Sequence, residues 1–599
     1  MDIPFKDRPP NLPDNRPLAE HRLRLLGNRL QKNPELSGRY TASMHELLDR
    51  GYAEAVTDEN LKGRDGYTWY LPHHPVLHPR KPDKCRLVYD CAAKYRGVSL
   101  NDKVHQGPDL TNGLVGVLLR FRQEPIALMA DIEGMFHQVR VSEGDRDALR
   151  FLWWRNDDPN ETPMTYRMTA HLFGGVWSPS CANFAIKRCA KDNAENFDPN
   201  TISTVIRNFY VDDCLKSVAS PEEAVRLVQE LRQLLSNGGF HLTKWVSNSR
   251  EVLRSVPECE WAKGVKTLNL DRELLPAERT LGVLWRVESD TYGFDVHLEE
   301  KPLTRRGLLS TVCSVYDPLG FVSPFVLRAK ILFQELCRNK CGWDNPMPSE
   351  VKDQWSRWLQ DVPLIQNLDV PRCLKPEGFE VESAELHHFA DASEHGYGAV
   401  SYLRLVDTTG APHCSFLMSK SRLAPLKSTT IPRLELAAAV EAVKLDKLLC
   451  KELQMSLQTS TGIINGRPIT RISDDPKDLT PLTPNHLLLL RSGPTLPSGL
   501  FVKQDIYRRR WRQVQYMADI FWKRWRSEYL PTLQERQKWL CPKRNFQVGD
   551  LVLVKHDNSP RPRWPLGLIV DTYPGSDGLV RSVQVKTQSG VYVRPVDKI

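Results

Sequence analysis

The sequence predicts a multidomain α+β protein, and three observations support this prediction. Its 599 residues exceed what one hydrophobic core organises, since domains average about 150 residues. Apolar residues make up 41% and charged residues 26% of the chain, as in folded globular proteins, so wholesale disorder is excluded. Between residues 86 and 298, short β-prone runs alternate with helical patterns, which is typical of α+β domains.

The composition also excludes several protein classes. The longest apolar run, Leu114–Phe121, is about half of the roughly 18 to 20 residues that a membrane span needs. The start of the chain, Met1–Pro10, is charged and proline-rich, unlike a secretory signal peptide. The 13 cysteines are scattered, which favours a reducing compartment. We therefore expect a protein that is not secreted and has no membrane partner.

Helical and extended elements alternate from the N-terminus onward. Apolar residues in His21–Arg50 recur at helical spacing, and the prolines of Pro72–Lys84 require an extended or looped segment. A later helix has clear boundary signals, because Ser220 can act as N-cap and Glu223 can complete a capping box. A further helix is expected over Arg433–Lys451, after two strand-like runs.

Acidic residues beside two β-prone runs are the strongest functional signal. The segment Arg207–Val218 (RNFYVDDCLKSV) predicts a tight hairpin with Asp212 and Asp213 at its tip, although such acids are often merely solvated. The apolar run Ile126–Ala130 predicts a strand that delivers Asp131 at its end. Buried strands that end in carboxylates are costly unless a cation neutralises them. Two such ends side by side would suit two Mg²⁺ ions, with Mn²⁺ as a substitute, and nucleotidyl transfer.

These segments resemble the motifs of reverse transcriptases. Tyr210–Asp213 resembles the YxDD hairpin, and Asp131–Phe136 (DIEGMF) resembles the first catalytic motif. Other segments that follow the family's order are Lys84–Asp102 (fingers), Leu172–Ala185 (template and nucleotide positioning), Gly238–Asn248 (last palm motif) and Thr280–Trp285 (primer grip). The resemblance implies an RNA- and DNA-templated DNA polymerase that binds a primer–template and deoxynucleoside triphosphates. It also implies that Asp131, Asp212 and Asp213 are the catalytic metal ligands.

The same resemblance implies four nucleotide contacts. Arg86 matches the arginine that contacts the incoming triphosphate, and Phe136 matches the ring that excludes a ribonucleotide 2′-hydroxyl. Lys244 matches a proton donor to pyrophosphate, with a solvent-facing lysine as the alternative. Phe173 stands where retroviral enzymes have a glutamine, so the contact with the sugar 3′-hydroxyl is expected to differ.

A second set of acids resembles part of an RNase H site. Asp391 follows a strand-like run and precedes a glycine-containing hairpin, and Glu435 lies on the next helical pattern. RNase H cleavage normally uses four carboxylates around two metals. Between residues 436 and 470 the only aspartate is Asp446, which still lies on the helical pattern. We therefore expect RNase H activity to be lost.

The C-terminal part carries most of the excess positive charge. Residues 503–544 contain twelve Lys and Arg against four Asp and Glu, a net charge of +8. The expected nucleic-acid-binding residues are Arg508, Arg509, Arg510, Arg512, Lys523, Arg524 and Arg526. The alternative is a solvated basic helix face. The last segment resembles the SH3-like C-terminal barrel of integrases, which implies contact with DNA or chromatin.

Taken over almost its whole length, the chain resembles the Pol polyproteins of Pao/BEL LTR retrotransposons. The segments SVYDPLGFVSP (Ser314–Pro324) and TGIINGRPIT (Thr461–Thr470) support this resemblance, the second as the end of an integrase core. Most of the integrase and the back half of RNase H are missing, as after an internal deletion or a mis-spliced gene model. The resemblance implies a location in the cytoplasm, in a virus-like particle, or in the nucleus. A catalytically inactive or host-retained nucleic-acid-binding remnant is the alternative function.

The expected architecture is a right-hand polymerase with fingers, palm and connection, a truncated RNase H-like α/β unit, a basic helix and an SH3-like β-barrel. The expected domains are an N-terminal helical segment (1–60), reverse transcriptase fingers and palm (61–300), thumb or connection helices (301–383), a truncated RNase H-like unit (384–460), an integrase remnant and linker (461–502), a basic helical region (503–545) and an SH3-like domain (546–599).

Overall fold

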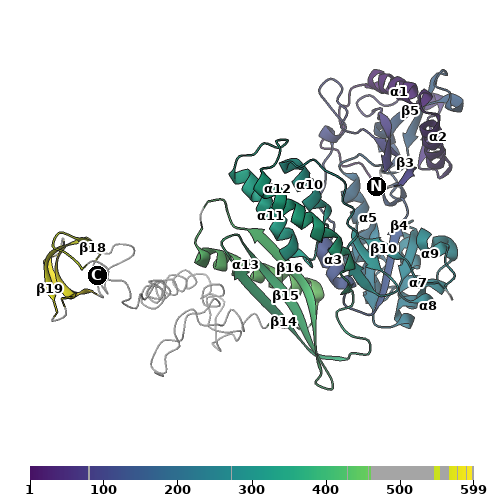
Figure 1. Ribbon diagram of the computed structural model, residues 1–599. Helices are drawn as coiled ribbons and strands as arrows, with labels where there is room; N and C mark the ends of the chain where they lie inside the picture. Colours follow the sequence, from purple (N-terminus) through teal and green to yellow (C-terminus); the bar gives the residue numbers. More distant parts are fainter. Residues whose placement is uncertain are drawn as a thin grey trace, which may run out of the picture. The chain divides into compact units, whose positions relative to one another are not determined.

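The computed structural model describes residues 1–78, 81–270, 273–427, 429–455, 457–459, 545–553, 566–575, 578–587 and 590–596. The chain divides into two compact units, whose described parts lie within residues 1–459 and 545–596 (Figure 1). The larger unit mixes helices and strands, and the described part of the smaller unit consists of strands, which agrees with the predicted multidomain class. In the described residues, no helix is both long and apolar enough to cross a membrane.

The N-terminal region packs two helices against a small sheet and a hairpin. Its elements are α1 (Arg16–Gln31), α2 (Pro34–Asp49), β1 (Ala53–Ala55), β2 (His73–His78), β3 (Lys81–Tyr89), β5 (Arg150–Trp154) and β6 (Pro163–Met168). Strands β1, β6 and β5 form one sheet, and β2 pairs with β3. The described residues of the proline-rich segment are therefore extended, as predicted. His73 is buried and bonded to the Tyr40 hydroxyl and the Leu152 carbonyl, so it belongs to the core.

The central antiparallel sheet has the order β7-β8-β4-β9. Its strands are β4 (Ile126–Ile132), β7 (Phe209–Tyr210), β8 (Asp213–Val218) and β9 (Leu242–Ser247). The neighbouring helices are α3 (Leu114–Phe121), α4 (Met135–Gln138), α5 (Ser178–Asp192), α6 (Pro199–Arg207), α7 (Pro221–Asn237), α8 (Arg250–Arg254) and α9 (Lys263–Lys266). The predicted cap of α7 is confirmed, since the Ser220 side chain accepts from the Glu223 amide. These elements bury one continuous apolar core.

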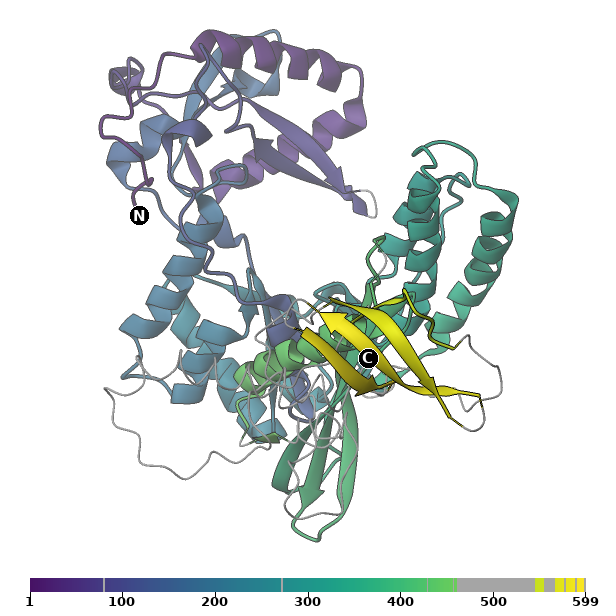
Figure 2. The same cartoon turned by 90° about the vertical axis from the view of Figure 1, so that its left-hand side faces the viewer.

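A second small sheet leads into a three-helix group. The strands β10 (Ala277–Thr280), β11 (Val283–Arg286), β12 (Thr291–Gly293) and β13 (Val370–Pro371) form the sheet, and the helices are α10 (Arg305–Ser314), α11 (Ser323–Arg338) and α12 (Ser349–Asp361). The helices have a core of their own, in which Trp355 stacks on Trp358 and Trp358 on Phe325. Figures 1 and 2 show them as teal helices near the ends of the long green strands.

The region expected to resemble RNase H is a four-stranded sheet with one long helix. Its elements are β14 (Val381–Ala392), β15 (Gly396–Asp407), β16 (Pro412–Leu423), α13 (Ile431–Leu453) and β17 (Leu457–Thr459). The order is β16-β15-β14-β17, and β17 is parallel to β14. The expected hairpin and helix are therefore present. The strand that follows the helix ends without an aspartate, as the sequence indicates.

This sheet and the central sheet share one hydrophobic core, because side chains of both regions belong to the same buried cluster. Buried arginines also join them. Arg122 is 2% exposed and donates to the carbonyls of Pro371, Arg372 and Leu417. Glu452 at the end of α13 pairs with Arg120, and a side chain at Gly116 would lie 2.6 Å from the Glu452 carboxylate. The two regions are therefore packed as parts of one unit.

The C-terminal unit is a four-stranded antiparallel sheet of β18 (Leu551–Leu553), β19 (Leu566–Pro574), β20 (Val580–Thr587) and β21 (Gly590–Pro595). Val552, Ile569, Val583 and Val585 form its core. Among the described residues, β18 and β21 do not pair, so the sheet does not show the closure of the expected barrel. The expected integrase remnant at 461–502 and the basic region up to residue 544 lie outside the described residues.

Replacement of Arg372 by methionine is expected to destabilise the larger unit by about 3–5 kcal/mol. Arg372 is fully buried, pairs with Asp290 at 2.6 Å, and donates to the carbonyls of Phe121, Glu124 and Pro125. Its loss would leave the partly buried Asp290 carboxylate and three carbonyls without this donor. Denaturant unfolding measures the effect, with the exposed Arg188→Met as the control. A change below about 1 kcal/mol for Arg372→Met would contradict this account.

Candidate active site

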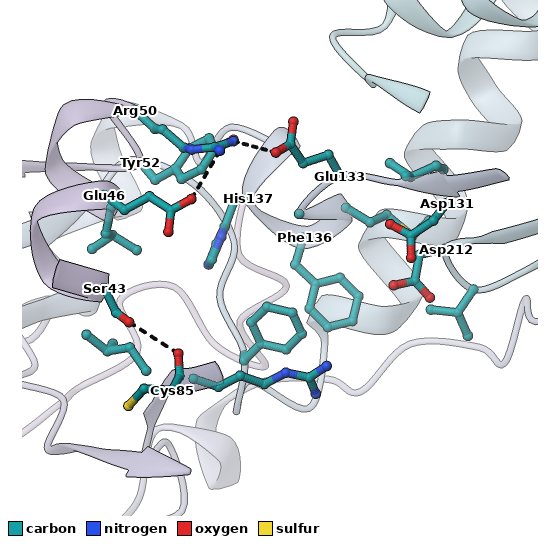
Figure 3. A pocket seen from close by; sticks show the side chains of 18 of the residues that line it. Ser43, Glu46, Arg50, Tyr52, Cys85, Asp131, Glu133, Phe136, His137 and Asp212 are labelled. Atoms are coloured by element: carbon teal, nitrogen blue, oxygen red, sulfur yellow. Dashed lines mark hydrogen bonds and ion pairs between the residues drawn. The ribbon is translucent and has the colours of Figure 1, made fainter. Parts of the chain in front are cut away.

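The central sheet brings the predicted acids together. Asp131 lies directly opposite Asp213 in the antiparallel pairing of β4 with β8. The Ile132 amide donates to the Asp212 carbonyl at 2.9 Å, which fixes the turn beside β4. At the tip, Val211 has a φ of +57°, which is unfavourable for a β-branched residue and is the kind of strain found at functional turns. Figure 3 shows the Asp131 and Asp212 carboxylates facing each other.

These carboxylates open into a cleft of about 450 Å³. Six of the seven residues predicted for the polymerase site line this cleft: Arg86, Asp131, Phe136, Phe173, Asp212 and Lys244. Asp213 is not part of the lining and lies beside it, across the sheet from Asp131. Residues from five separate parts of the chain thus meet at one place.

Burial and mutual repulsion raise the pKa values of the two hairpin acids. The pKa of Asp213 rises to about 7, first because of burial and then because of the neighbouring Asp212 and Asp131 carboxylates. Burial, followed by the charge of Asp131, also raises the pKa of Asp212. Such crowding of acids disfavours their ionised form, and a divalent cation would reverse this effect.

Lys244 provides positive charge within the cleft. Its Nζ atom lies 2.6 Å from Oδ1 of Asp131, whose side chain is 20% exposed. Lys244 lies on β9, the neighbour of β4 on the side away from β8. Lys244 therefore contacts Asp131 in the cleft, while its side chain remains 55% exposed to solvent.

Aromatic rings form another wall of the cleft. The ring centroids of Phe136 and Phe173 are 4.9 Å apart, and His137 meets Phe173 edge to face at 5.5 Å. Burial lowers the pKa of His137 to about 4, so this ring is neutral at pH 7. Phe173 is fixed through its backbone, because its carbonyl accepts from the Tyr89 amide at the end of β3.

Several cleft residues escaped the sequence analysis. Arg50, at the end of α2, donates to Glu133 at 2.9 Å (Figure 3). Glu133 also contacts His241 at 3.3 Å. Glu133 could have been suspected because it lies between Asp131 and Phe136 in the same motif. Arg50 gave no local signal, since only folding brings α2 to the cleft.

The second acidic pair is also brought together, at the end of β14 and the start of α13. Burial and the charge of Asp391 raise the pKa of Glu435, and the two side chains share a hydrogen bond. Asp446 does not join them, because it lies 3.2 Å from Nε2 of the buried His388. His388 in turn bonds the Ser401 hydroxyl. Asp446 therefore has a structural role between the helix and the sheet.

Three family models match successive parts of the chain. Residues 86–245 match the reverse transcriptase (RNA-dependent DNA polymerase) model, and residues 304–463 match the Pao retrotransposon-like RNaseH-like domain. Residues 509–599 match a family of unknown function, DUF5641. The chain is a Pao retrotransposon-like protein. In this Pao-like protein, the RNaseH-like model begins at residue 304 and so includes helices α10–α12, ahead of the sheet where we expected that unit to start.

Solved structures of a foamy viral protease-reverse transcriptase also match. One in complex with dsDNA has 15% identity and a TM-score of 0.46, and covers 80% of this chain and 80% of its own. A dRH form with dsDNA has 16% identity and a TM-score of 0.45, covering 70% of this chain and 62% of its own. A complex with an RNA/DNA hybrid has 14% identity and a TM-score of 0.44, covering 93% and 62%. The Pao-like chain thus spans about three fifths of two of these proteins. No curated protein matches it.

The donor atoms of the cleft fit a hard cation such as Mg²⁺, because Asp131 and Asp212 present carboxylate oxygens. The structure groups fewer metal-binding side chains closely together than the sequence predicts. Within the described parts of the Pao-like protein, no three His, Cys, Asp or Glu side chains are grouped closely enough to hold a metal ion. Asp131 is instead paired with Lys244. The seven predicted basic contacts, Arg508 to Arg526, lie outside the described residues.

The raised pKa of Asp213 predicts a pH-dependent stability in EDTA. Between about pH 4 and pH 7, Asp213 keeps its proton in the folded state and loses it in the unfolded state. The stability that Asp213 contributes is therefore present at low pH and is lost as the pH rises through about 7. The difference between a pKa of about 4 in the unfolded state and about 7 in the folded state corresponds to about 4 kcal/mol. Asp213→Asn should therefore gain stability over the wild type at pH 8 and little at pH 4, measured by denaturant unfolding. An equal difference at both pH values would contradict the assignment.

Proposed function

We propose that this chain is a retroelement reverse transcriptase that extends a primer 3′-hydroxyl with deoxynucleotides on RNA or DNA templates. The observation that carries the proposal is the cleft, where six residues predicted from five separate motifs meet. This cleft is built mainly by the segment that matches the reverse transcriptase model. Such a site combines paired carboxylates, a nearby arginine and an aromatic wall, as nucleotidyl transfer requires.

Each residue has a role that follows from its chemistry. Asp131 and Asp212, with Asp213 beside them, would hold Mg²⁺, or Mn²⁺ in its place, which would supply charge neutralisation at the reacting phosphate. Arg86 is exposed in the cleft and can bind the triphosphate through its guanidinium. The Phe136 ring limits the space beside the sugar. Phe173 supports that ring in place of a hydrogen-bonding glutamine.

The remaining regions complete this proposal. We assign the first unit to a right-hand polymerase whose RNase H-like part has lost cleavage, because only Asp391 and Glu435 remain as a pair. The C-terminal unit would be an SH3-like module that contacts DNA or chromatin. The arginines from Arg508 to Arg526 would neutralise phosphates, with a strong dependence on salt. Such a protein would act in cytoplasmic particles or in the nucleus.

A primer-extension assay tests the proposed function. Wild-type protein with Mg²⁺ should extend a primer on RNA and DNA templates, and Asp212→Asn should reduce the rate by at least about 10³-fold, because a charge at the reacting centre is lost. Asp407→Asn, which changes a partly buried acid at the C-terminal end of β15 in the RNase H-like sheet, should retain full activity. Salt-sensitive DNA binding without extension would instead support the nucleic-acid-binding remnant.

The sugar preference should depend on Phe136. Phe136→Ala removes the ring beside the nucleotide sugar, so incorporation of ribonucleotides relative to deoxynucleotides should rise by about 10²-fold, as expected for a lost steric contact worth a few kcal/mol. The ratio of kcat/KM for matched ribo- and deoxynucleotides measures the effect. An unchanged ratio, together with retained extension, would show that another group excludes the 2′-hydroxyl.

A further inference from the structure

Strand β9 has an irregularity beside the acidic site. Its pairing with β4 runs from Asp131 opposite Thr243 to Met129 opposite Val246, so β9 contains one extra residue over this stretch. At this bulge Lys244 has a φ of +56°, in the left-handed region that non-glycine residues rarely adopt. Bulges of this kind re-aim a side chain beside active sites. The strain therefore points to a function for the lysine side chain.

The bulge lets β9 both bury side chains in the core and direct a lysine toward the acidic site. Trp245 and Val246 are 2% and 1% exposed and belong to the core, while Lys244 is directed out of the core toward Asp131. Without the extra residue, successive side chains would continue to alternate between the two faces of the sheet through this part of the strand. The left-handed residue lets the core side chains stay buried and lets the ammonium group reach 2.6 Å from the Asp131 carboxylate.

The local charge explains why a cation is needed there. Asp131, Asp212 and Asp213 bring three carboxyl groups together, because Asp131 lies opposite Asp213 and Asp212 precedes Asp213 at the hairpin tip. Among the described residues, Lys244 is the only cation that forms an ion pair with Asp131, and none pairs with Asp212 or Asp213. The group needs positive charge in the absence of metal, and Lys244 supplies it to the acid that a metal would also need.

We propose that Lys244 is a built-in counter-ion that holds Asp131 in the metal-free protein and must release it when a divalent cation binds. The inference deepens the proposed function, on which it rests only for the choice of Mg²⁺ as the ion. Lys244 is thus a positioning residue that sets how readily metal enters.

The test is calorimetric titration of the full chain with Mg²⁺, and separately Mn²⁺, without nucleic acid or nucleotide. Lys244→Asn removes the charge with a residue that tolerates the left-handed conformation, so the fold should persist. Its affinity for the ion should rise about tenfold, because the metal no longer competes with an ammonium group. Lys244→Arg keeps the charge and should bind within about threefold of the wild type.

Lys216→Asn is the matched control. Lys216 lies on β8, three residues after Asp213, and its ammonium group bonds Asn200 and none of the three acids. Loss of either lysine changes the net charge by the same amount. If Lys216→Asn gained as much affinity for the ion as Lys244→Asn, a general effect of net charge would explain the gain, and the ion pair with Asp131 would not. A Lys244→Asn variant that binds the ion no more tightly than the wild type, or not at all, would also overturn the inference.

The two proposals fail in different ways. If the wild type extends primers but Lys244→Asn gains no metal affinity, the counter-ion role is wrong and the polymerase function stands. If Lys244→Asn gains affinity but the wild type extends no primer, the counter-ion role stands and the polymerase function is wrong.

Discussion

The pairing of β4 with β8 is the constraint on which the site depends. Because Asp131 lies opposite Asp213, and the hairpin tip carries Asp212, three carboxylates are fixed at one edge of a buried sheet. Burial of the apolar side chains along both strands offsets the unfavourable free energy of crowding these acids, because the register that buries those side chains also sets the positions of the acids. A one-residue shift would turn Asp213 to the other face of the sheet and separate it from Asp131.

The rest of the larger unit supports that sheet from two directions. The N-terminal region supplies Arg86 and Arg50 to the cleft, and the bond between Phe173 and Tyr89 ties the aromatic wall to β3. On the other side, the RNase H-like sheet shares the core of the central sheet. An RNase H-like region that lacks a full acid set thus still contributes to the stability of the cleft, through packing and not through chemistry.

Much of this arrangement could be predicted because it is local in sequence. The hairpin at Asp212, the strand before Asp131 and the helix capped by Ser220 each follow from short patterns of apolar, turn and capping residues. The buried arginines could not be predicted, since Arg122 and Arg372 are paired only after distant carbonyls and carboxylates converge on them. The Lys244 contact depends on a bulge, whose extra residue leaves no pattern in the sequence. The contact of Asp446 with His388 could not be predicted either, because the two residues lie 58 positions apart in the sequence.

We propose that Asp131 and Asp212 share a divalent cation in this cleft. Anomalous diffraction from crystals of the full chain soaked in Mn²⁺ tests it most directly, because the scattering locates the ion without reference to activity. The account predicts a peak within coordination distance of both carboxylates, with the Lys244 ammonium group moved away from Asp131. A peak elsewhere, or an empty cleft in which the lysine still holds Asp131, would contradict it.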